Sequence, residues 1–217
     1  MFKKISVILT VMLLVLSTSF ANGTEVGVNA DKALKMLLDG NQRFVTEQYA
    51  DNNNGQIRRD ELTKGQHPSA IIVSCSESRV PPELVFDEGL GDLFVVRTAG
   101  EVVDDVALGS IEYAIEHLNV KLVVVLGHEE CGAVKATIAG GEVPGHIVSI
   151  AKAIAPAINQ AKMQEGDLLT NSIEANVDLI VDKLKTSEPI IKKYIENEHV
   201  EVVGAVYDLK TGKVVYR

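Results

Sequence analysis

Four short runs rich in valine, isoleucine and leucine constrain the fold of this 217-residue chain more than any other feature. They lie at residues 69–74, 93–97, 122–127 and 200–207, and segments with helical periodicity separate them. The first three runs are continuously apolar, as in strands that are covered on both faces of a sheet. Strands that alternate with helices favour an α/β fold built on a mostly parallel central sheet.

Helices are predicted where apolar residues recur with helical spacing, and a hairpin strand is predicted near the C terminus. The turn-forming residues 208–212 precede a short apolar run at 214–216, so the sheet should have four to five strands flanked by helices. The helical patterns cover residues 82–86, 106–118, 147–160, 172–184 and 189–196.

Before the first strand, we expect a helix over residues 31–38 that Gly40 ends, and a second short helix around 41–46. Residues 50–64 are polar and contain a run of asparagines, which predicts a loop. The chain shows no internal repeat and no linker, which indicates a single domain.

Residues 1–21 are predicted to be a signal peptide. Lys3 and Lys4 precede an apolar run at 5–16, and Ser19 and Ala21 supply the small residues of a cleavage site. The run is shorter than a membrane-spanning helix requires, so no stable membrane anchor is expected. We therefore expect export to a periplasm or the exterior, with a mature domain at residues 22–217.

The composition argues against nucleic acids and anionic membranes as partners. The formal net charge is −9, the aromatic content is 5%, and there is no tryptophan. An acidic chain without a basic run repels phosphate backbones and anionic membranes, so no nucleic-acid partner is expected.

Three potential metal ligands follow two of the predicted strands. Cys75 comes directly after the apolar run 70–73, His128 follows 123–127, and Cys131 comes three residues later. In open α/β sheets, ligands bind beyond the carboxyl ends of the strands. Thiolate and imidazole are ligands that zinc prefers, and three of them leave a fourth position for catalysis. The alternative interpretation is a Cys75–Cys131 disulfide, which is common in exported proteins.

The segments around these residues resemble the signatures of the β-class carbonic anhydrases. Residues 75–81 (Cys-Ser-Glu-Ser-Arg-Val-Pro) are similar to the Cys-Ser-Asp-Ser-Arg signature of that family. Residues 127–133 (Gly-His-Glu-Glu-Cys-Gly-Ala) resemble the second signature. The likeness extends from about residue 33 to the C terminus, which implies one β-carbonic-anhydrase-like catalytic domain.

The resemblance implies zinc (one Zn²⁺ per chain) at Cys75, His128 and Cys131, and zinc-bound hydroxide as the nucleophile that attacks carbon dioxide. The implied enzyme is a carbonate dehydratase, a lyase that converts carbon dioxide and water reversibly into bicarbonate and a proton. Glu77, held by Arg79, would accept the hydrogen bond of the zinc-bound water.

Other positions match the family by their spacing. Gln66 matches a substrate-orienting glutamine, Phe94 and Tyr113 match residues that line the substrate pocket, and Gly132 belongs to the second signature. In the family, such residues often face the site across a dimer interface, and the N-terminal helix packs on the partner subunit. The resemblance thus implies a homodimer or a dimer of dimers.

Two residues depart from the family pattern. Glu77 stands where the family has aspartate, and Glu101 stands where asparagine is usual. Two alternative functions stay open, and the departure at Glu77 leaves room for the first of them. One is a hydrolase of a carbon dioxide analogue such as carbonyl sulfide or carbon disulfide, and the other is a weakly active homologue that binds zinc or bicarbonate.

Overall fold

The computed structural model of the chain describes residues 28–52, 54–142 and 144–217. The predicted signal peptide at residues 1–21 lies outside the described residues.

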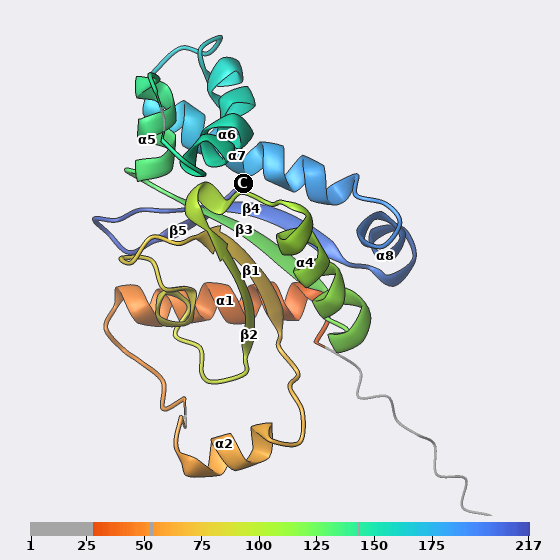
Figure 1. Cartoon of the computed structure of the whole chain (residues 1–217). Coiled ribbons are helices and arrows are strands. Elements are labelled where there is room, and N and C mark those ends of the chain that lie inside the picture. Colours follow the sequence, from red (N-terminus) through yellow and green to blue (C-terminus); the bar gives the residue numbers. More distant parts are fainter. Residues whose placement is uncertain (1–27, 53, 143) are drawn as a thin grey trace, which may run out of the picture.

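The described residues form helices and strands in the alternating order that the apolar runs predict (Figure 1). The strands are β1 (Ala70–Cys75), β2 (Leu93–Thr98), β3 (Leu122–His128), β4 (Glu201–Tyr207) and β5 (Val214–Tyr216). The helices are α1 (Ala30–Val45), α2 (Gln56–Leu62), α3 (Pro82–Val85), α4 (Asp105–Leu118), α5 (Gly132–Ala139), α6 (Ile147–Ala161), α7 (Leu168–Lys185) and α8 (Ile191–Glu198), with a 3-10 turn η1 (Ala99–Glu101). Among the described residues, no helix combines the length and hydrophobicity needed to cross a membrane.

The five strands form one sheet in the order β2-β1-β3-β4-β5. Strands β1 to β4 are parallel, and β5 pairs antiparallel with β4, which confirms the predicted mostly parallel sheet and its final hairpin. The chain passes from β1 to β2 on one side and then to β3 on the other side of β1. The carboxyl ends of β1 and β3 therefore flank a topological switch point, where α/β proteins bind ligands.

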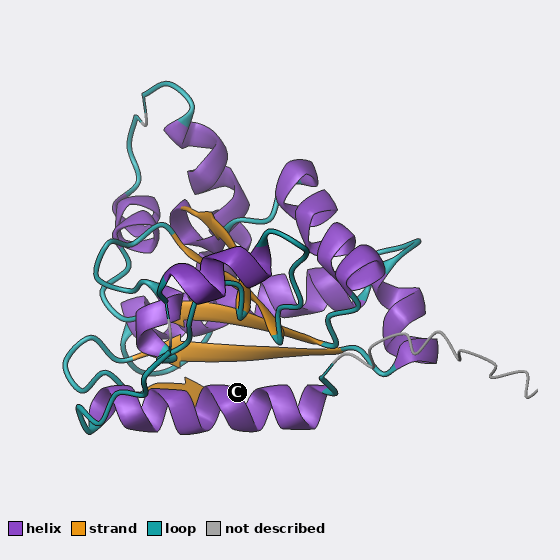
Figure 2. Cartoon of the chain, turned by 90° about the horizontal axis from the view of Figure 1, so that it is seen from below, coloured by secondary structure: helices purple, strands orange, loops and turns teal. Residues whose placement is uncertain are grey.

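Helices cover both faces of the sheet, and alternate strand residues belong to different cores. One core packs residues such as Ile71 and Val123 against α4, α7 and α8. The other packs Ile72 and Val124 against α1 and α3. Figure 2 shows α1 lying along one face of the sheet, with other helices on the opposite side. Because both faces are covered, β1 and β3 are buried along their whole length, as their apolar sequences predict.

The prediction that Gly40 ends the first helix is wrong, because α1 continues through it to Val45. Gly40 is instead a contact point: a Cβ atom placed there would lie 1.8 Å from the carbonyl oxygen of Phe86. The glycine lets the backbones of α1 and α3 approach each other, a tertiary requirement that the local pattern does not reveal.

Two further expectations differ from the structure. The 50–64 segment contains α2, which has no buried residue and therefore no apolar periodicity to reveal it. Strand β2 is not covered on both faces, since all six of its residues are half-buried. Its position at the edge of the sheet explains this exposure.

Helix α1 packs on the sheet of its own chain through Ala33 and Leu37, which are fully buried. Leu34 packs partly against the same core, whereas Leu38 is 46% exposed. Leu37 is therefore not available to a partner, and the predicted packing of α1 on a second subunit would involve the remaining face of the helix. That contact stays a prediction.

Candidate metal centre

The three predicted metal ligands converge at the switch point of the sheet. Cys75 is the last residue of β1, and His128 is the last residue of the neighbouring strand β3. Cys131 follows after a short turn and is the N-cap residue of α5. The turn includes Glu130, whose φ of 57° is in the left-handed region and reverses the chain toward α5. Two strand ends and one helix start thus bring the side chains together.

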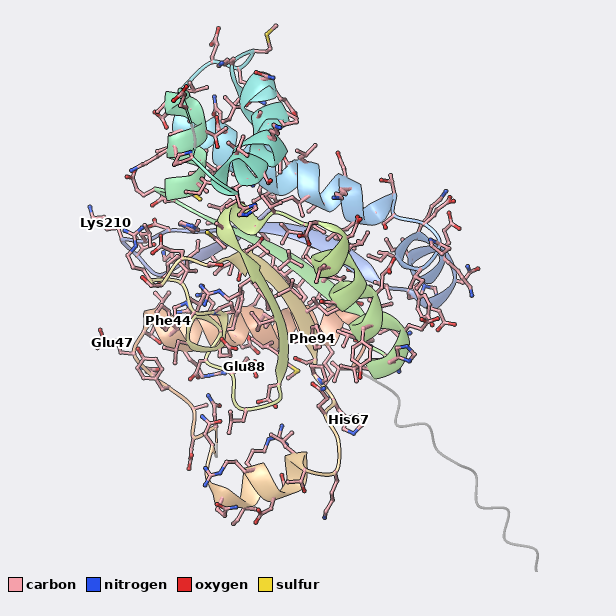
Figure 3. All side chains as sticks on the ribbon, in the orientation of Figure 1. Phe44, Glu47, His67, Glu88, Phe94 and Lys210 are labelled. Atoms are coloured by element: carbon pink, nitrogen blue, oxygen red, sulfur yellow. The ribbon has the colours of Figure 1, made fainter. Side chains whose placement is uncertain are left out.

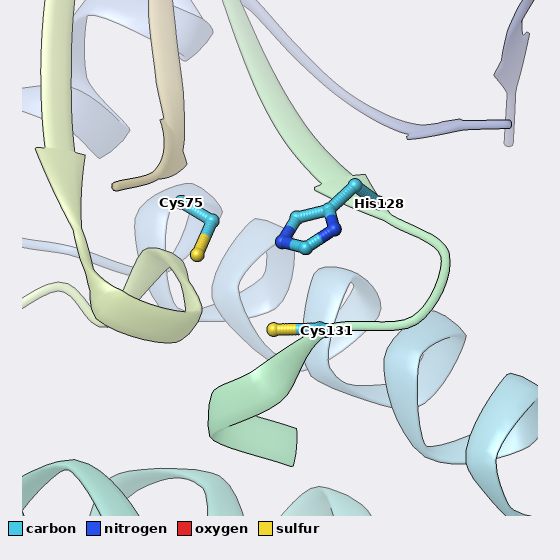
Figure 4. Close-up of side chains that lie close together, drawn as sticks. All are labelled: Cys75, His128 and Cys131. Carbon is cyan, nitrogen blue, oxygen red and sulfur yellow. The ribbon is translucent and has the colours of Figure 1, made fainter. Parts of the chain in front are cut away.

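The ligand atoms of Cys75, His128 and Cys131 all lie within 4.8 Å of one another (Figure 4). The cluster is enclosed: Cys75 is 8% exposed, and His128 and Cys131 are 1% exposed. Apolar side chains from the helices above the strand ends surround it, namely Val134, Ile154, Ile158 and Ile173. No other group of metal-ligating side chains is found in the part of the chain that the structure describes.

His128 is oriented with one ring nitrogen directed to a backbone partner. Its Nδ1 atom lies 2.8 Å from the carbonyl oxygen of Glu129, which can only accept a hydrogen bond, so the proton is on Nδ1. The lone pair is then on Nε2, which is buried without a hydrogen-bond partner among the described residues. A buried acceptor without a partner is costly, and a metal ion would satisfy it.

Cys75 and Cys131 are free cysteines in the structure and interact as a pair. Hydrogen bonding from Cys131 is the main cause that lowers the pKa of Cys75 to about 4, with smaller effects from His128 and the Gly100 N–H, while burial opposes the change. The same bond raises the pKa of Cys131. The pair therefore favours one thiolate and one thiol, and a bound cation would be needed to hold both as thiolates. This donor set fits zinc.

Glu77 and Arg79 form a two-bond ion pair beside the cluster. Arg79 donates from Nε to Oε1 and from Nη2 to Oε2 of Glu77, each at 2.8 Å. The hydrogen bond from Arg79 lowers the pKa of Glu77 to about 2. The carboxylate is thus ionised and can only accept hydrogen bonds. The structure places Glu77 against Arg79 as predicted, while its catalytic role stays a prediction.

Arg97 on β2 holds the loop that carries Glu77 and was not singled out from the sequence. Its Nε atom donates to the carbonyl oxygen of Cys75 at 2.9 Å. Its Nη2 atom donates to the carbonyl oxygens of Glu77 at 2.6 Å and Val80 at 3.2 Å. One guanidinium group therefore fixes three carbonyl groups of the 75–80 loop. A charged residue near the end of an apolar strand could have indicated a role for Arg97. The neighbouring sequence does not show which carbonyl groups it bonds to.

The remaining predicted site residues are not all beside the cluster in the single chain. Phe94 pairs with Ile71, four residues before Cys75, so it lies ~13 Å back along the strand. Its ring is 6.4 Å from that of Tyr113, which is 48% exposed. Figure 3 shows Phe94 well away from the carboxyl ends of the strands, and His67 near the opposite end of β1.

Gln66, the neighbour of His67, is exposed and precedes the amino end of β1. Gly132 does lie at the cluster, since it follows Cys131 and begins α5, where a Cβ atom would meet nothing within 4 Å. For Gln66, Phe94 and Tyr113, a role at a metal site requires a second chain, and these roles stay predictions.

Comparison of the sequence with known protein families matches residues 70–214 to the family described as carbonic anhydrase. The carbonic anhydrase of Mycolicibacterium smegmatis is 43% identical over 194 residues, covering 87% of this chain and 94% of the relative. Carbonic anhydrase 2 of Mycobacterium tuberculosis is 39% identical over 193 residues, covering 87% of this chain and 93% of the relative.

Solved structures show the same fold. The Coccomyxa β-carbonic anhydrase in complex with acetazolamide matches with a TM-score of 0.69 and 26% identity, over 84% of this chain and 85% of that chain. The β-carbonic anhydrase CcaA matches with a TM-score of 0.67 and 25% identity, over 84% of this chain and 94% of that chain.

Proposed function

Because this chain belongs to the β-class carbonic anhydrase family, we propose that it catalyses the reversible hydration of carbon dioxide to bicarbonate and a proton. The proposal includes a zinc ion held by Cys75, His128 and Cys131. The observation that carries it is the buried cluster of these three ligands, in which His128 Nε2 has no hydrogen-bond partner among the described residues.

Zinc bound at such a site lowers the pKa of a water ligand toward neutrality and so supplies hydroxide as the nucleophile. The chain's own residues would orient that reaction. Glu77 is ionised and offers an acceptor beside the ligands, so it would align the water proton away from the attacking lone pair. Arg79 holds the carboxylate in place, and Arg97 holds the loop. Apolar side chains surround the cluster, and this low-dielectric setting strengthens the electrostatic interactions within it.

The test measures zinc content and carbon dioxide hydration by stopped flow in the purified mature chain. We expect about one zinc per chain, in agreement with a three-ligand site. Cys131→Ser and His128→Gln should lose both zinc and activity because each removes a ligand. His146→Gln is the matched control, since this exposed residue precedes α6, and it should retain both.

Two outcomes would contradict the proposal. One is a Cys75–Cys131 disulfide detected by mass spectrometry in fresh, metal-containing protein. The other is a His128→Gln variant that hydrates carbon dioxide at the wild-type rate. The same assay with carbonyl sulfide as substrate separates hydration from hydrolysis of the analogue, and a zinc-loaded protein inactive on both would be a binding homologue.

We also propose that the chain acts as a homodimer or a dimer of dimers. Exposed apolar residues support this proposal: Leu38 on α1, Val106 on α4 and Tyr113 on α4 are 46%, 79% and 48% exposed. A second chain would be needed to bring Gln66, Phe94 and Tyr113 to a metal site. Analytical ultracentrifugation of the mature protein tests this, and a monomer with full activity would contradict it.

Export remains a proposal as well. It rests on the basic residues, apolar run and small residues of positions 1–21. N-terminal sequencing of the protein from the producing cell should find a mature chain that begins after Ala21, and an uncleaved chain in the cytoplasm would refute export.

A further inference from the structure

The turn after β2 has a backbone conformation that aims an amide at the metal cluster. Gly100 (φ 67°, ψ 29°) and Glu101 (φ 45°) are consecutive residues with positive φ. This conformation directs the Gly100 N–H to the sulfur of Cys75, with an N–S distance of 3.2 Å. Positive φ is unfavourable for glutamate, so something must hold the turn in place.

A side chain at Gly100 would be strained by the positive φ and would force its neighbours to shift. A Cβ atom there would lie 2.6 Å from Cδ1 of Ile154 and 3.1 Å from Cβ of Ala133. The turn is therefore pressed against α6 and α5, close to Cys75. The packing explains why the position is glycine, but it does not explain what fixes the direction of the N–H group.

Asn176 on α7 supplies that restraint. Its Nδ2 atom donates to the carbonyl oxygen of Gly100 at 3.0 Å and to Oε1 of Glu101 at 2.9 Å. One amide group thus holds both residues of the turn. Asn176 and Glu101 are each 1% exposed. Two polar side chains are costly to bury, and this contact is what offsets the cost for the bonded atoms.

A glycine in strand β3, Gly127, leaves the space for this contact. A Cβ atom at Gly127 would lie 2.6 Å from Cγ2 of Val177 and 3.6 Å from Oε1 of Glu101. Gly127 therefore lets α7 come close enough to the sheet for Asn176 to reach the turn. The contact of Asn176 with the turn and the backbone beside His128 therefore lie in the same packed region.

We propose that Asn176 and Glu101 are positioning residues that hold the Gly100 N–H on the Cys75 sulfur and so set the donor strength of this thiolate toward the metal. The inference rests on the proposed metal site. A hydrogen bond to a thiolate withdraws negative charge from the sulfur, so Cys75 would neutralise a bound cation less completely. In a site with two thiolates, this increases the acidity of a water ligand.

The test uses full-length mature protein loaded with cobalt, because the thiolate-to-cobalt charge-transfer absorption reports sulfur donor strength. In Asn176→Ala, we expect this band to move to longer wavelength, since the sulfur loses its N–H donor. The midpoint pH of hydration by the zinc form should move upward in the same variant. Asn171→Ala on the same helix is the matched control, since Asn171 bonds to Glu165 instead, and its band should not move.

Glu101→Gln keeps a side-chain oxygen that can accept the hydrogen bond from Asn176. The charge-transfer band of this variant should therefore have the same wavelength as that of the wild type. If Asn176→Ala does not fold, Asn176→Ser provides the second variant, because its hydroxyl can donate one bond and should give a smaller shift. A folded, cobalt-loaded Asn176 variant whose band matches the wild type would overturn the proposal.

The hydrogen bond can also be tested without a variant. In cadmium-substituted wild-type protein, NMR should detect scalar coupling between the Gly100 amide proton and the metal through the N–H···S bond. Absence of that coupling in a loaded protein overturns the inference alone. If the wild-type chain takes up no metal at all, the proposed function fails instead.

Discussion

Glu77 and Arg79 form a pair whose two members differ in exposure. The Arg79 side chain is 55% exposed and that of Glu77 is 16% exposed. An ion pair with one exposed member contributes little to folding, typically ~0–1 kcal/mol. The ion pair instead orients Glu77, because two parallel hydrogen bonds fix the direction of the carboxylate beside the cluster. Glu77 is longer than the aspartate of the family, and Arg79 restricts that additional freedom.

Arg79→Ala should therefore reduce catalysis without reducing stability. The freed carboxylate can leave its acceptor position or turn onto the metal, and we expect kcat/KM to fall on the order of 100-fold. Zinc content should be retained, and the free energy of unfolding should change by less than about 1 kcal/mol. Stopped-flow kinetics, metal analysis and urea denaturation measure the three quantities.

Arg59→Ala is the control for a lost surface arginine, since Arg59 bonds within its own helix region and lies on α2. It should leave all three quantities unchanged. Wild-type kcat/KM in Arg79→Ala would show that Glu77 does not need its partner.

At the scale of elements, two adjacent residues near the C-terminal end of α1 link the helix to segments distant in the sequence. Asn41 is 7% exposed and donates from Nδ2 to the carbonyl oxygens of Val85 and Gly212, while its Oδ1 accepts from the Val214 N–H. Gly40 provides the close approach to Phe86 that brings α1 within reach of these partners. The helix thus joins α3 and the hairpin of β4 and β5.

Gly40→Ala tests this attachment, because helix propensity and packing predict opposite signs. In an unobstructed helix, replacing glycine with alanine stabilises by about 1 kcal/mol. Here the added Cβ would lie 1.8 Å from a backbone oxygen, so α1 or α3 must shift. We expect a loss of about 2–4 kcal/mol in the free energy of unfolding, measured by urea denaturation.

Gln42→Ala, at an exposed position of the same helix, should change that free energy by less than about 0.5 kcal/mol. If Gly40→Ala were stabilising instead, the close packing of α1 on α3 would be incorrect.

For the whole molecule, Asp87 joins distant segments and makes stability depend on pH. Its carboxylate accepts from Arg43 of α1 at 2.5 Å, from the Ala50 N–H at 2.9 Å and from Asn52 at 3.2 Å. Burial opposes its ionisation, but these hydrogen bonds outweigh burial and lower the pKa of Asp87 below its usual 3.8. A lowered pKa contributes stability that is present above the unfolded value and lost as the pH falls toward the folded value.

Asp87→Asn should consequently destabilise the protein at pH 7 by about 1–3 kcal/mol, because Arg43 loses its charged acceptor. The difference from the wild type should shrink as the pH falls from about 4, the usual pKa of an aspartate in an unfolded chain, toward the lower pKa of Asp87 in the folded protein, where the carboxylate becomes protonated. Urea denaturation across this range measures the difference. Asp39→Asn is the control, since Asp39 is 56% exposed and pairs with Lys35, and it should have little effect at any pH. A difference that is constant with pH would contradict this account.

The sequence by itself determined the sheet and the metal cluster. Apolar runs and the residues that end them are local properties, so the strands, their mostly parallel arrangement and the positions of Cys75 and His128 could be predicted from them, whereas the order of the strands in the sheet could not. Cys131 could be predicted as a third ligand because it follows His128 by three residues and carries a thiol that zinc prefers. The helix α2 was not predicted because none of its residues is fully buried, so its sequence has no apolar periodicity.

Only the tertiary structure decided what surrounds the cluster. Asn176 meets Glu101 across 75 residues of sequence, and Arg97 meets Cys75 across 22. The local sequence predicts that Gly40 ends a helix, and only the close approach of the Phe86 carbonyl shows why a glycine stands at this position. Local periodicity reports which face of an element is buried, but it carries no information on which distant group will pack there. Those contacts depend on how the helices close over the sheet.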